Sequence, residues 1–459
     1  MRFLMAACLF LIATQHSAAQ HIKRKGGLGV GFFQHTPDSL VKKLNYKEGA
    51  VVQFIVPGTT AANLGLQVND IITNINNIKI ILPNEILAPA KNLREDDKII
   101  ITLLRNNKEI VFKGNVVARA KETSSAADVI YGEFAYKNGY VRTIYKAPKG
   151  KIPLGTVYFL QGLPCYSMDN FKELDITKLA IDAMVDRGFA VYRMEKADMG
   201  DNTNMAPCET MGFNDELDMY IAGYKNLLTL KEVDTAKIFL FGHSMGGLTA
   251  PLVAEIFQPK GVMVYGTVFK PWMDYLFDAY QLQSQYYGDD LGQLRDNVEL
   301  MKPYIYDYFY YNKTEEEVCN EPVGRMAMET ILGYDVKTKL AASGRSAKCH
   351  KELNQHNMAK AWGKTNGYVL AMYGECDIAA IHPDDHIALI DYVNKVHPGK
   401  GTFWLAPKST HMFEEIGSMQ EFIRWQATLN EYYKYASTKF NSKIFEYCCN
   451  WMKAVMGKG

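Results

Sequence analysis

The sequence predicts an α/β protein in two parts: a small β-rich domain, then a mostly parallel, doubly wound sheet with helices on both faces. At 459 residues the chain is too long for one compact domain. Beyond Asp128, short apolar strands alternate with helices of amphipathic spacing, the pattern of a parallel sheet covered on both sides. The stretch from Lys121 to Ala127 is polar and has no apolar period, which predicts a linker over residues 119–127.

Neither the charge nor the composition favours nucleic acid as a partner. The chain has a net charge of +1, with 48% hydrophobic and 22% charged residues. A balanced charge gives no electrostatic attraction for nucleic acid or for an anionic membrane surface. We therefore expect an ordinary globular protein without a nucleic-acid partner.

The N-terminal segment predicts a secretory signal peptide over residues 1–19. Arg2 supplies a positive charge, the apolar run extends from Phe3 to Ala13, and small residues precede Gln20. The run is too short to span a bilayer, and no later stretch is long enough, so we expect no transmembrane segment. Cleavage after Ala19 predicts an exported protein, periplasmic or secreted.

Seven cysteines follow the predicted cleavage site, and an odd number leaves at least one thiol free. Export permits disulfides, and we expect the pairs Cys165–Cys208 and Cys319–Cys349, with buried free thiols as the open alternative. No Cys-x-x-Cys or Cys/His spacing indicates a metal site. We expect neither a metal nor an organic cofactor.

The β-rich domain is expected over residues 25–118. A glycine-rich segment is followed by a strand ending at Val56, a Pro57-Gly58 turn, a short helix and a second strand after Asp70. Two further strands, 98–104 and 109–112, would be joined by the turn residues Asn106 and Asn107.

Residues 28–117 resemble a PDZ domain of the bacterial exported type. The resemblance lies in the loop Gly27-Leu28-Gly29-Val30, in the helix after Pro57-Gly58 and in the Asn-Asp-Ile-Ile run that opens the second strand. It implies that the amides of Leu28, Gly29 and Val30 receive the terminal carboxylate of a peptide that extends the sheet. A domain that only packs against its neighbour is the alternative.

Two residues in this region depart from the PDZ pattern. Asn69 stands where the family usually has glycine, and Pro89 falls in the helix that would line the groove.

The second domain is expected over residues 128–459. It begins with a hairpin turned at Asn138-Gly139, and a C-terminal helix is expected over residues 440–456. Between them the predicted helices are 175–187 and 214–230, and the predicted strands are 156–160, 189–193, 237–241, 261–265, 368–373 and 402–405.

The strand 237–241 runs into the sequence Gly242-His243-Ser244-Met245-Gly246. This is the G-x-S-x-G pattern of a sharp strand-to-helix turn that exposes a serine nucleophile. Both glycines stand where a Cβ would collide with the neighbouring strand or helix. Ser244 is therefore the candidate nucleophile, although a plain turn serine is the alternative.

An acid and a histidine follow two later strands, where the carboxyl ends of a parallel sheet would gather them. Asp377 comes just after strand 368–373, and His411 after strand 402–405. The order Ser…Asp…His is that of the α/β-hydrolases, which this domain resembles throughout. The residues competing with these assignments are Glu375, Asp384 and Asp385 for the acid, and His382 and His386 for the base.

The resemblance implies a serine hydrolase related to dienelactone hydrolase, prolyl oligopeptidase and serine aminopeptidase. His411 would act as the base and Asp377 would orient it. The oxyanion donors would be the amides of Met245 and of Leu163, in the loop that begins Gln161-Gly162.

A carboxylic ester is the first choice of substrate. A short peptide, cleaved by an exopeptidase, is the alternative. A peptide-binding scaffold with an inert hydrolase domain is the alternative of another class. An aromatic-rich insertion at about 268–364 predicts a helical cap over the site, either lining the substrate pocket or packing on itself.

Overall fold

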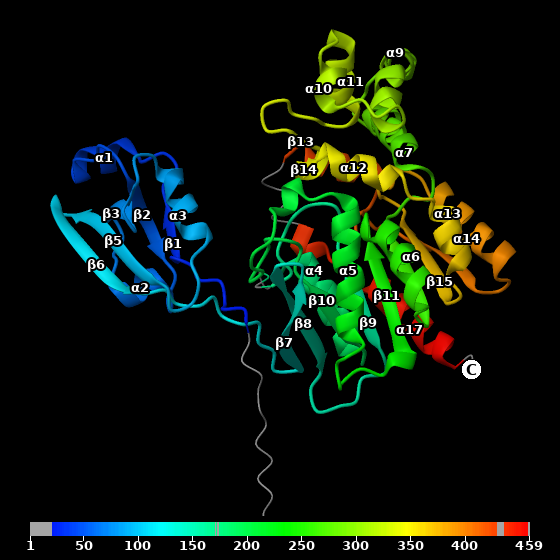
Figure 1. Ribbon diagram of the computed structural model, residues 1–459, viewed down its shortest axis with the longest axis horizontal. Helices are drawn as coiled ribbons and strands as arrows, with labels where there is room; N and C mark the ends of the chain where they lie inside the picture. The colour runs from blue at the N-terminus through cyan, green and yellow to red at the C-terminus, as the bar shows by residue number, and fades with distance from the viewer. Residues whose placement is uncertain (1–20, 170, 172–173, 429–435, 458–459) are drawn as a thin grey trace, which may run out of the picture.

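The computed structural model describes residues 21–169, 171, 174–428 and 436–457. The predicted signal peptide lies outside these residues. Figure 1 shows the two predicted parts as separate bodies, a small domain in blue and a larger one that runs from teal to red. In the described residues, no helix combines the length and apolar character needed to cross a membrane.

The small domain is built on one antiparallel sheet with the order β1-β2-β3-β5-β6, and β4 pairs with β3. Its strands are β1 Val30–Phe32, β2 Ala50–Ile55, β3 Ile71–Ile75, β4 Ile78–Lys79, β5 Lys98–Arg105 and β6 Lys108–Asn115. Its helices are α1 Asp38–Leu44, α2 Thr60–Leu64, the short 3₁₀ turn Pro83–Ile86 and α3 Leu87–Lys91. Alternate strand residues such as Val52, Ile72 and Ile101 are fully buried and form the core.

Both departures from the PDZ pattern are accommodated. Asn69 has φ 71°, in the left-handed region where glycine is the usual residue and asparagine is tolerated better than most. Pro89 falls in the first turn of the five-residue α3, where proline costs little.

The large domain contains an eight-stranded sheet in the described residues, in the order β16-β15-β12-β11-β9-β10-β8-β7. The strands from β16 to β10 run parallel, and β8 and β7 add an antiparallel edge. They are β7 Ala127–Tyr136, β8 Gly139–Pro148, β9 Thr156–Leu160, β10 Ala190–Met194, β11 Ile238–His243, β12 Gly261–Tyr265, β15 Tyr368–Gly374 and β16 Gly401–Ala406. The fold class predicted from the sequence is confirmed. Strand β7 begins at Ala127, the last residue of the predicted linker.

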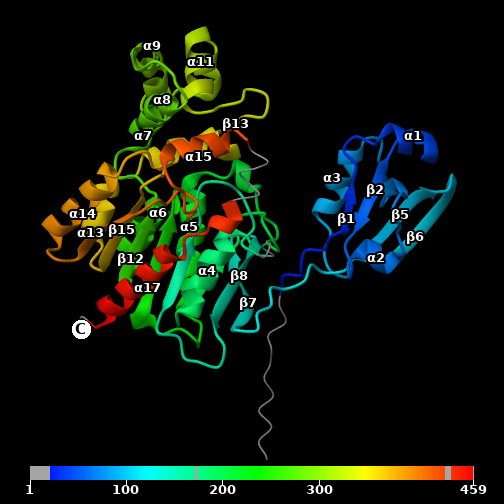
Figure 2. The same cartoon turned by 180° about the vertical axis from the view of Figure 1, so that it is seen from behind.

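Helices cover both faces of this sheet, as the alternation of strands and helices predicted. One face carries α5 Phe213–Leu227, α6 Gly246–Phe257, α13 Met358–Lys364 and α14 Asp384–Val396; the other carries α4 Ile176–Asp186 and α17 Ser442–Met456. Figure 2 shows α4 and α17 from behind the sheet. Successive strand residues point to opposite faces of the sheet. Leu240 packs in the cluster on the α5–α6 face, and Phe239 packs in the cluster on the α4–α17 face.

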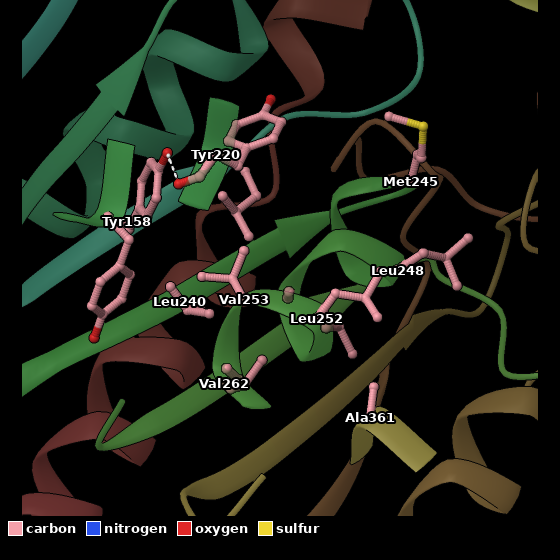
Figure 3. Close-up of a cluster of buried hydrophobic side chains, with 14 of the residues drawn as sticks. Tyr158, Tyr220, Leu240, Met245, Leu248, Leu252, Val253, Val262 and Ala361 are labelled. Atoms are coloured by element: carbon pink, nitrogen blue, oxygen red, sulfur yellow. Dashed lines mark hydrogen bonds between the residues drawn. The ribbon is translucent and has the colours of Figure 1, made fainter. Parts of the chain in front are cut away.

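Figure 3 shows the hydrophobic cluster on the α5–α6 face of the sheet. Leu240 and Val262 of the sheet contact Leu252 and Val253 of α6 there, and the Tyr158 hydroxyl donates a hydrogen bond to the Tyr220 carbonyl oxygen at 3.2 Å. The continuously apolar strands therefore have a partner on each side, which explains why they do not alternate with polar residues.

Between β12 and β15 the chain forms the helical region predicted as a cap. It comprises α7 Trp272–Asp278, a π-helical turn Ala279–Gln283, α8 Ser284–Tyr286, α9 Leu291–Phe309, α10 Glu315–Cys319, α11 Pro322–Ile331, the small strands β13 Leu340–Ala341 and β14 Arg345–Ser346, and α12 Ala347–Asn354. Tyr308 and Phe309 are buried in a cluster that belongs to this region alone. Many of its aromatic residues therefore pack on each other. Trp272 and Tyr275 of α7 also line the candidate site.

The two domains are joined by buried polar contacts. Arg24 forms ion pairs with Asp169 and, at 2.6 Å, with Asp201, and its side chain is only 6% exposed. Arg94 donates hydrogen bonds to the carbonyl oxygens of Asp201 at 2.9 Å and Asn202 at 2.7 Å. The small domain therefore holds loops that follow β9 and β10.

Candidate active site

Ser244 lies at the sharp turn between β11 and α6. Its φ is 56°, a left-handed conformation that is uncommon for a residue with a side chain. A Cβ at Gly242 would collide with the Gly246 carbonyl oxygen, and a Cβ at Gly246 with that of Leu160. The two glycines therefore allow the turn, and Ser244 is partly exposed at the end of the strand.

Asp377 and His411 meet at the same edge of the sheet. The Nδ1 atom of His411 lies 2.9 Å from Asp377 Oδ2 and 3.0 Å from Oδ1. The amides of Ala379 and Ala380 donate to Asp377 Oδ1 at 2.9 and 2.8 Å, which fixes the carboxylate. Gly266, with φ 61°, makes room for the pair, because a Cβ there would lie 2.7 Å from both Asp377 Oδ2 and His411 Nδ1.

The pair is electrostatically matched. Burial alone would raise the pKa of Asp377, but His411 and the Ala380 amide outweigh it and hold that pKa below its usual range. Burial would likewise lower the pKa of His411, and the Asp377 carboxylate outweighs it and raises that pKa. Asp377 is fully buried, whereas the His411 side chain remains 17% exposed. The imidazole can therefore take up a proton at Nε2, while Asp377 at Nδ1 stabilises the resulting positive charge.

The other candidate acids and the candidate base His382 do not contact His411 among the described residues. Asp384 is 78% exposed and pairs with the exposed His382. Glu375 accepts a hydrogen bond from the Lys408 amide. Asp385 accepts from the amides of Phe269 and Lys270. None of these carboxylates contacts His411 in the described residues.

Two further histidines support the site, and the sequence did not reveal their roles. His243, the residue before Ser244, has Nε2 at 2.8 Å from the His411 carbonyl oxygen, and burial lowers its pKa to about 3. The neutral ring therefore donates this bond and holds the His411 loop. His386 accepts a hydrogen bond from the Thr267 amide at 3.1 Å, and burial lowers its pKa to about 4.

The predicted oxyanion loop lies against the serine. A Cβ at Gly162 would be 3.3 Å from the Cβ of Ser244, so the Gly162–Leu163 backbone passes directly beside the nucleophile. Met245 follows Ser244 at the start of α6, whose N-terminus favours negative charge. Among the described residues, the amides of Met245 and Leu163 donate no hydrogen bond to another loop or turn.

The cysteines give one predicted pair and one correction. Cys165 and Cys208 form a disulfide that ties the oxyanion loop to the segment before α5. The predicted pair Cys319–Cys349 is wrong, because both side chains are buried free thiols. Cys319 packs within the cap cluster and Cys349 within the cluster on the α5–α6 face, so they belong to different cores.

A small cavity of about 30 Å³ surrounds the nucleophile. Its lining includes Ser244, Met245 and His411, together with Trp272 and Tyr275 of α7. The Tyr275 hydroxyl donates to the Ala379 carbonyl oxygen at 2.9 Å, which ties α7 to the loop that carries Asp377. This volume holds about one water molecule, so α7 leaves little free space beside the serine.

A second cavity, of about 350 Å³, lies between α6, α7 and the α12–α13 connection. Leu248 and Trp272 line both cavities. The indole of Trp272 donates a hydrogen bond to His350 Nδ1 at 3.1 Å. Trp272 therefore forms a common wall of the two spaces.

The PDZ loop borders a groove of its own. A cavity of about 360 Å³ is lined by Leu28, Gly29 and Val30, by Ile86, Leu87 and Ala90 on the opposite side, and by Arg119. Among the described residues, the amides of Leu28 and Gly29 donate no hydrogen bond to another loop or turn. The groove is therefore formed despite Pro89.

No metal site accompanies this chemistry in the part of the chain that the structure describes. No three His, Cys, Asp or Glu side chains come together there as a possible metal-binding group.

A mostly parallel sheet with an antiparallel edge, a serine on the left-handed turn after β11, and an acid and a histidine after β15 and β16 define an α/β-hydrolase fold. The first domain is a PDZ domain: residues 26–116 match the PDZ domain family. No curated protein matches the sequence significantly.

Solved structures with a similar fold include two esterases and a peptidase. Est1E from Butyrivibrio proteoclasticus, solved with ferulic acid, is 13% identical over 65% of this chain and 98% of its own, with a TM-score of 0.41. Pyrococcus furiosus esterase Pf2001 is 12% identical over 69% and 95%, with a TM-score of 0.39. Pyrococcus horikoshii acylaminoacyl peptidase is 12% identical over 75% and 48%, with a TM-score of 0.40.

Proposed function

We propose that the chain is an exported serine hydrolase that cleaves a carboxylic ester through an acyl-enzyme, with Ser244, His411 and Asp377 as its catalytic residues. The observation that carries the proposal is the convergence of these residues. Ser244 and His411 line one cavity, and the Nδ1 atom of His411 is held by the buried carboxylate of Asp377. A hydrolase of this type needs a nucleophile, a base and a group that orients the base.

The chemistry proceeds in two halves. His411 removes the proton from the Ser244 hydroxyl as the oxygen attacks the ester carbonyl carbon, and the resulting imidazolium is stabilised by Asp377. The tetrahedral intermediate places its negative oxygen at the amides of Met245 and Leu163. When it collapses, the alcohol leaves with the proton from His411. Water then attacks the acyl-enzyme in the same way, releasing the acid and free Ser244.

Activity-based labelling tests the proposal. A fluorophosphonate should label the wild-type chain at Ser244 and should leave Ser244→Ala unlabelled. If the folded wild type is not labelled, the inert scaffold is the better account of the chain.

A serine exopeptidase is the second candidate, favoured by the groove of about 360 Å³ on the adjoining PDZ domain. The same triad serves ester and amide cleavage, so substrate preference decides between the two. Turnover of p-nitrophenyl esters of varied chain length, compared with aminoacyl nitroanilides, separates esterase from peptidase.

The PDZ groove is proposed to bind the C-terminus of a peptide. The amides of Leu28, Gly29 and Val30 would receive the carboxylate, and the cavity between this loop and α3 would take the last side chain. Fluorescence anisotropy with a peptide library should show binding to peptides with a free C-terminus and at least tenfold weaker binding to their amidated forms. Equal affinity for the free and amidated peptides would show that the groove does not recognise the terminal carboxylate.

Trp272→Ala is expected to change the chain-length preference of the hydrolase. Removing the indole takes away the wall shared by the cavities of about 30 and 350 Å³, so a longer acyl chain can enter the larger one. Because each buried methylene contributes about 0.8 kcal/mol, kcat/KM for a p-nitrophenyl octanoate should rise at least tenfold relative to the acetate.

Trp404→Ala is the matched control for this variant. Its indole stacks on Tyr447 with ring centroids 4.3 Å apart and packs on the other face of the sheet. The control should keep the wild-type ratio of octanoate to acetate turnover. An unchanged ratio in Trp272→Ala would show that the acyl chain does not enter the larger cavity.

A further inference from the structure

Two carbonyl groups of the oxyanion loop are held by buried cations. The Lys196 ammonium donates to the Gly162 carbonyl oxygen at 2.6 Å and to that of Leu163 at 3.1 Å. The Arg345 guanidinium donates to the same Leu163 oxygen at 2.9 Å. The segment beside Ser244 is therefore fixed by two charged side chains from elsewhere in the fold.

These cations come from distant parts of the chain and share one counterion. Lys196 follows β10, Arg345 belongs to β14 in the cap region, and Glu216 lies on α5 between them. Glu216 lies 3.0 Å from the Lys196 nitrogen and 2.7 Å from Arg345 Nη2. The side chains are 0% exposed for Lys196 and Arg345 and 2% for Glu216. Two cations against one carboxylate leave an excess positive charge, which the loop carbonyl dipoles compensate.

The geometry of the peptide bond gives these contacts a consequence. In a trans peptide bond the C=O of Gly162 and the N–H of Leu163 lie in one plane and point in opposite directions. With its oxygen held at Lys196, that unit must turn the Leu163 N–H away from Lys196. The unit lies beside the nucleophile, because a Cβ on Gly162 would be 3.3 Å from the Ser244 Cβ. Rotation of this plane would put a carbonyl oxygen where a donor is needed.

We propose that Lys196 and Arg345 are positioning residues, which lock the Gly162–Leu163 peptide in the orientation that presents the Leu163 N–H to the oxyanion. The inference rests on the proposed hydrolase function and names a device within that site. Because Arg345 belongs to the cap region, the seating of this region on the core completes the oxyanion hole.

The charge of Lys196 adds a pH dependence to this device. Burial lowers the pKa of Lys196 to about 8, against the opposing effect of Glu216; Arg345 and Cys349 are the other charged or titratable groups that face it. The lowered pKa means that the ammonium loses its proton as the pH rises past about 8. Charge-assisted hydrogen bonds to the loop weaken there. The wild-type kcat should therefore decline above that pH, and a variant without the lysine should lack this decline.

The test compares Lys196→Met with Lys146→Met. The first variant should lower kcat for a p-nitrophenyl ester by about 10²-fold or more, the loss typical of an oxyanion donor, while KM stays within about threefold. A trifluoromethyl ketone that forms the tetrahedral adduct should lose affinity by a similar factor, whereas the carboxylate product should not. Lys146, on the edge strand β8 and away from the site, is also buried, at 3% exposure, and pairs with Glu122 and with Asp182 of α4. Its removal should leave kcat and the ketone affinity near wild type.

Arg345→Lys provides a second variant that keeps the charge but loses the two-pronged contact with Leu163 and Glu216. Its kcat should fall by about tenfold, and Arg345→Met should fall further. If folded Lys196→Met or Arg345→Met keeps the wild-type kcat and ketone affinity, the inference is overturned and the hydrolase proposal stands. If Lys196→Met does not fold, the two Arg345 variants decide by the same criterion. A folded wild type that neither reacts with fluorophosphonate nor cleaves any ester overturns both.

Discussion

Ser244→Ala is expected to lower kcat for ester cleavage by about 10⁶-fold while leaving the fold intact. The hydroxyl is the group that forms the acyl bond, and without it His411 has no nucleophile to activate. A residual rate above that of water should persist, because the oxyanion amides and the binding cavity remain. The measurement is single-turnover kinetics with a p-nitrophenyl ester, together with circular dichroism of both proteins.

Ser343→Ala is the matched control for this experiment. Ser343 also has a left-handed backbone, with φ 59°, but it is an exposed residue of the cap region and does not line the candidate cavity. Its replacement should leave kcat within about twofold of wild type. Near-normal turnover by Ser244→Ala would mean that another group attacks the substrate.

Asp377→Asn is expected to lower kcat by about 10⁴-fold, the second largest loss. The amide preserves the shape of the side chain but no longer holds the imidazole in the correct tautomer or stabilises the imidazolium. The pH profile should change as well. Only neutral His411 accepts a proton, so kcat/KM rises with pH through the pKa of His411. That pKa is lowered by burial but raised overall by Asp377. Without the carboxylate, the lowering of the pKa by burial is opposed by the smaller effect of Glu414, so the rising limb should move to lower pH.

Asp385→Asn separates this effect from the general loss of a buried carboxylate. Asp385 also accepts two backbone hydrogen bonds, from Phe269 and Lys270, and is 8% exposed. Its variant should keep the rising limb of the profile in place. If the rising limb of the pH profile stays fixed in Asp377→Asn, or moves equally in both variants, Asp377 does not set the pKa of His411.

The sequence predicted the strands and the convergence of the site because both depend on local pattern and on simple topology. Apolar runs define the strands, and the carboxyl ends of parallel strands meet at one edge. Ser244, Asp377 and His411 therefore reached one region although 167 residues separate the first from the last. Their catalytic roles remain predictions.

The supporting contacts could not be predicted, because they depend on side chains from elements whose relative packing the sequence does not reveal. Nothing local marks Lys196, Glu216 and Arg345 as partners, and His243 occupies a variable position of its motif. The Cys319–Cys349 prediction was wrong for the same reason. Spacing alone does not show that one thiol belongs to the cap cluster and the other to the core.

The disulfide between Cys165 and Cys208 bears on the cellular compartment in which the active site becomes fully formed. It secures the segment that also contains Gly162 and Leu163, and such bonds persist in oxidising surroundings but not against the glutathione of a cytosol. A chain that is still exposed to glutathione would lack this disulfide beside Ser244. Delivery to an oxidising compartment would then act as a maturation step that adds this covalent restraint beside the nucleophile.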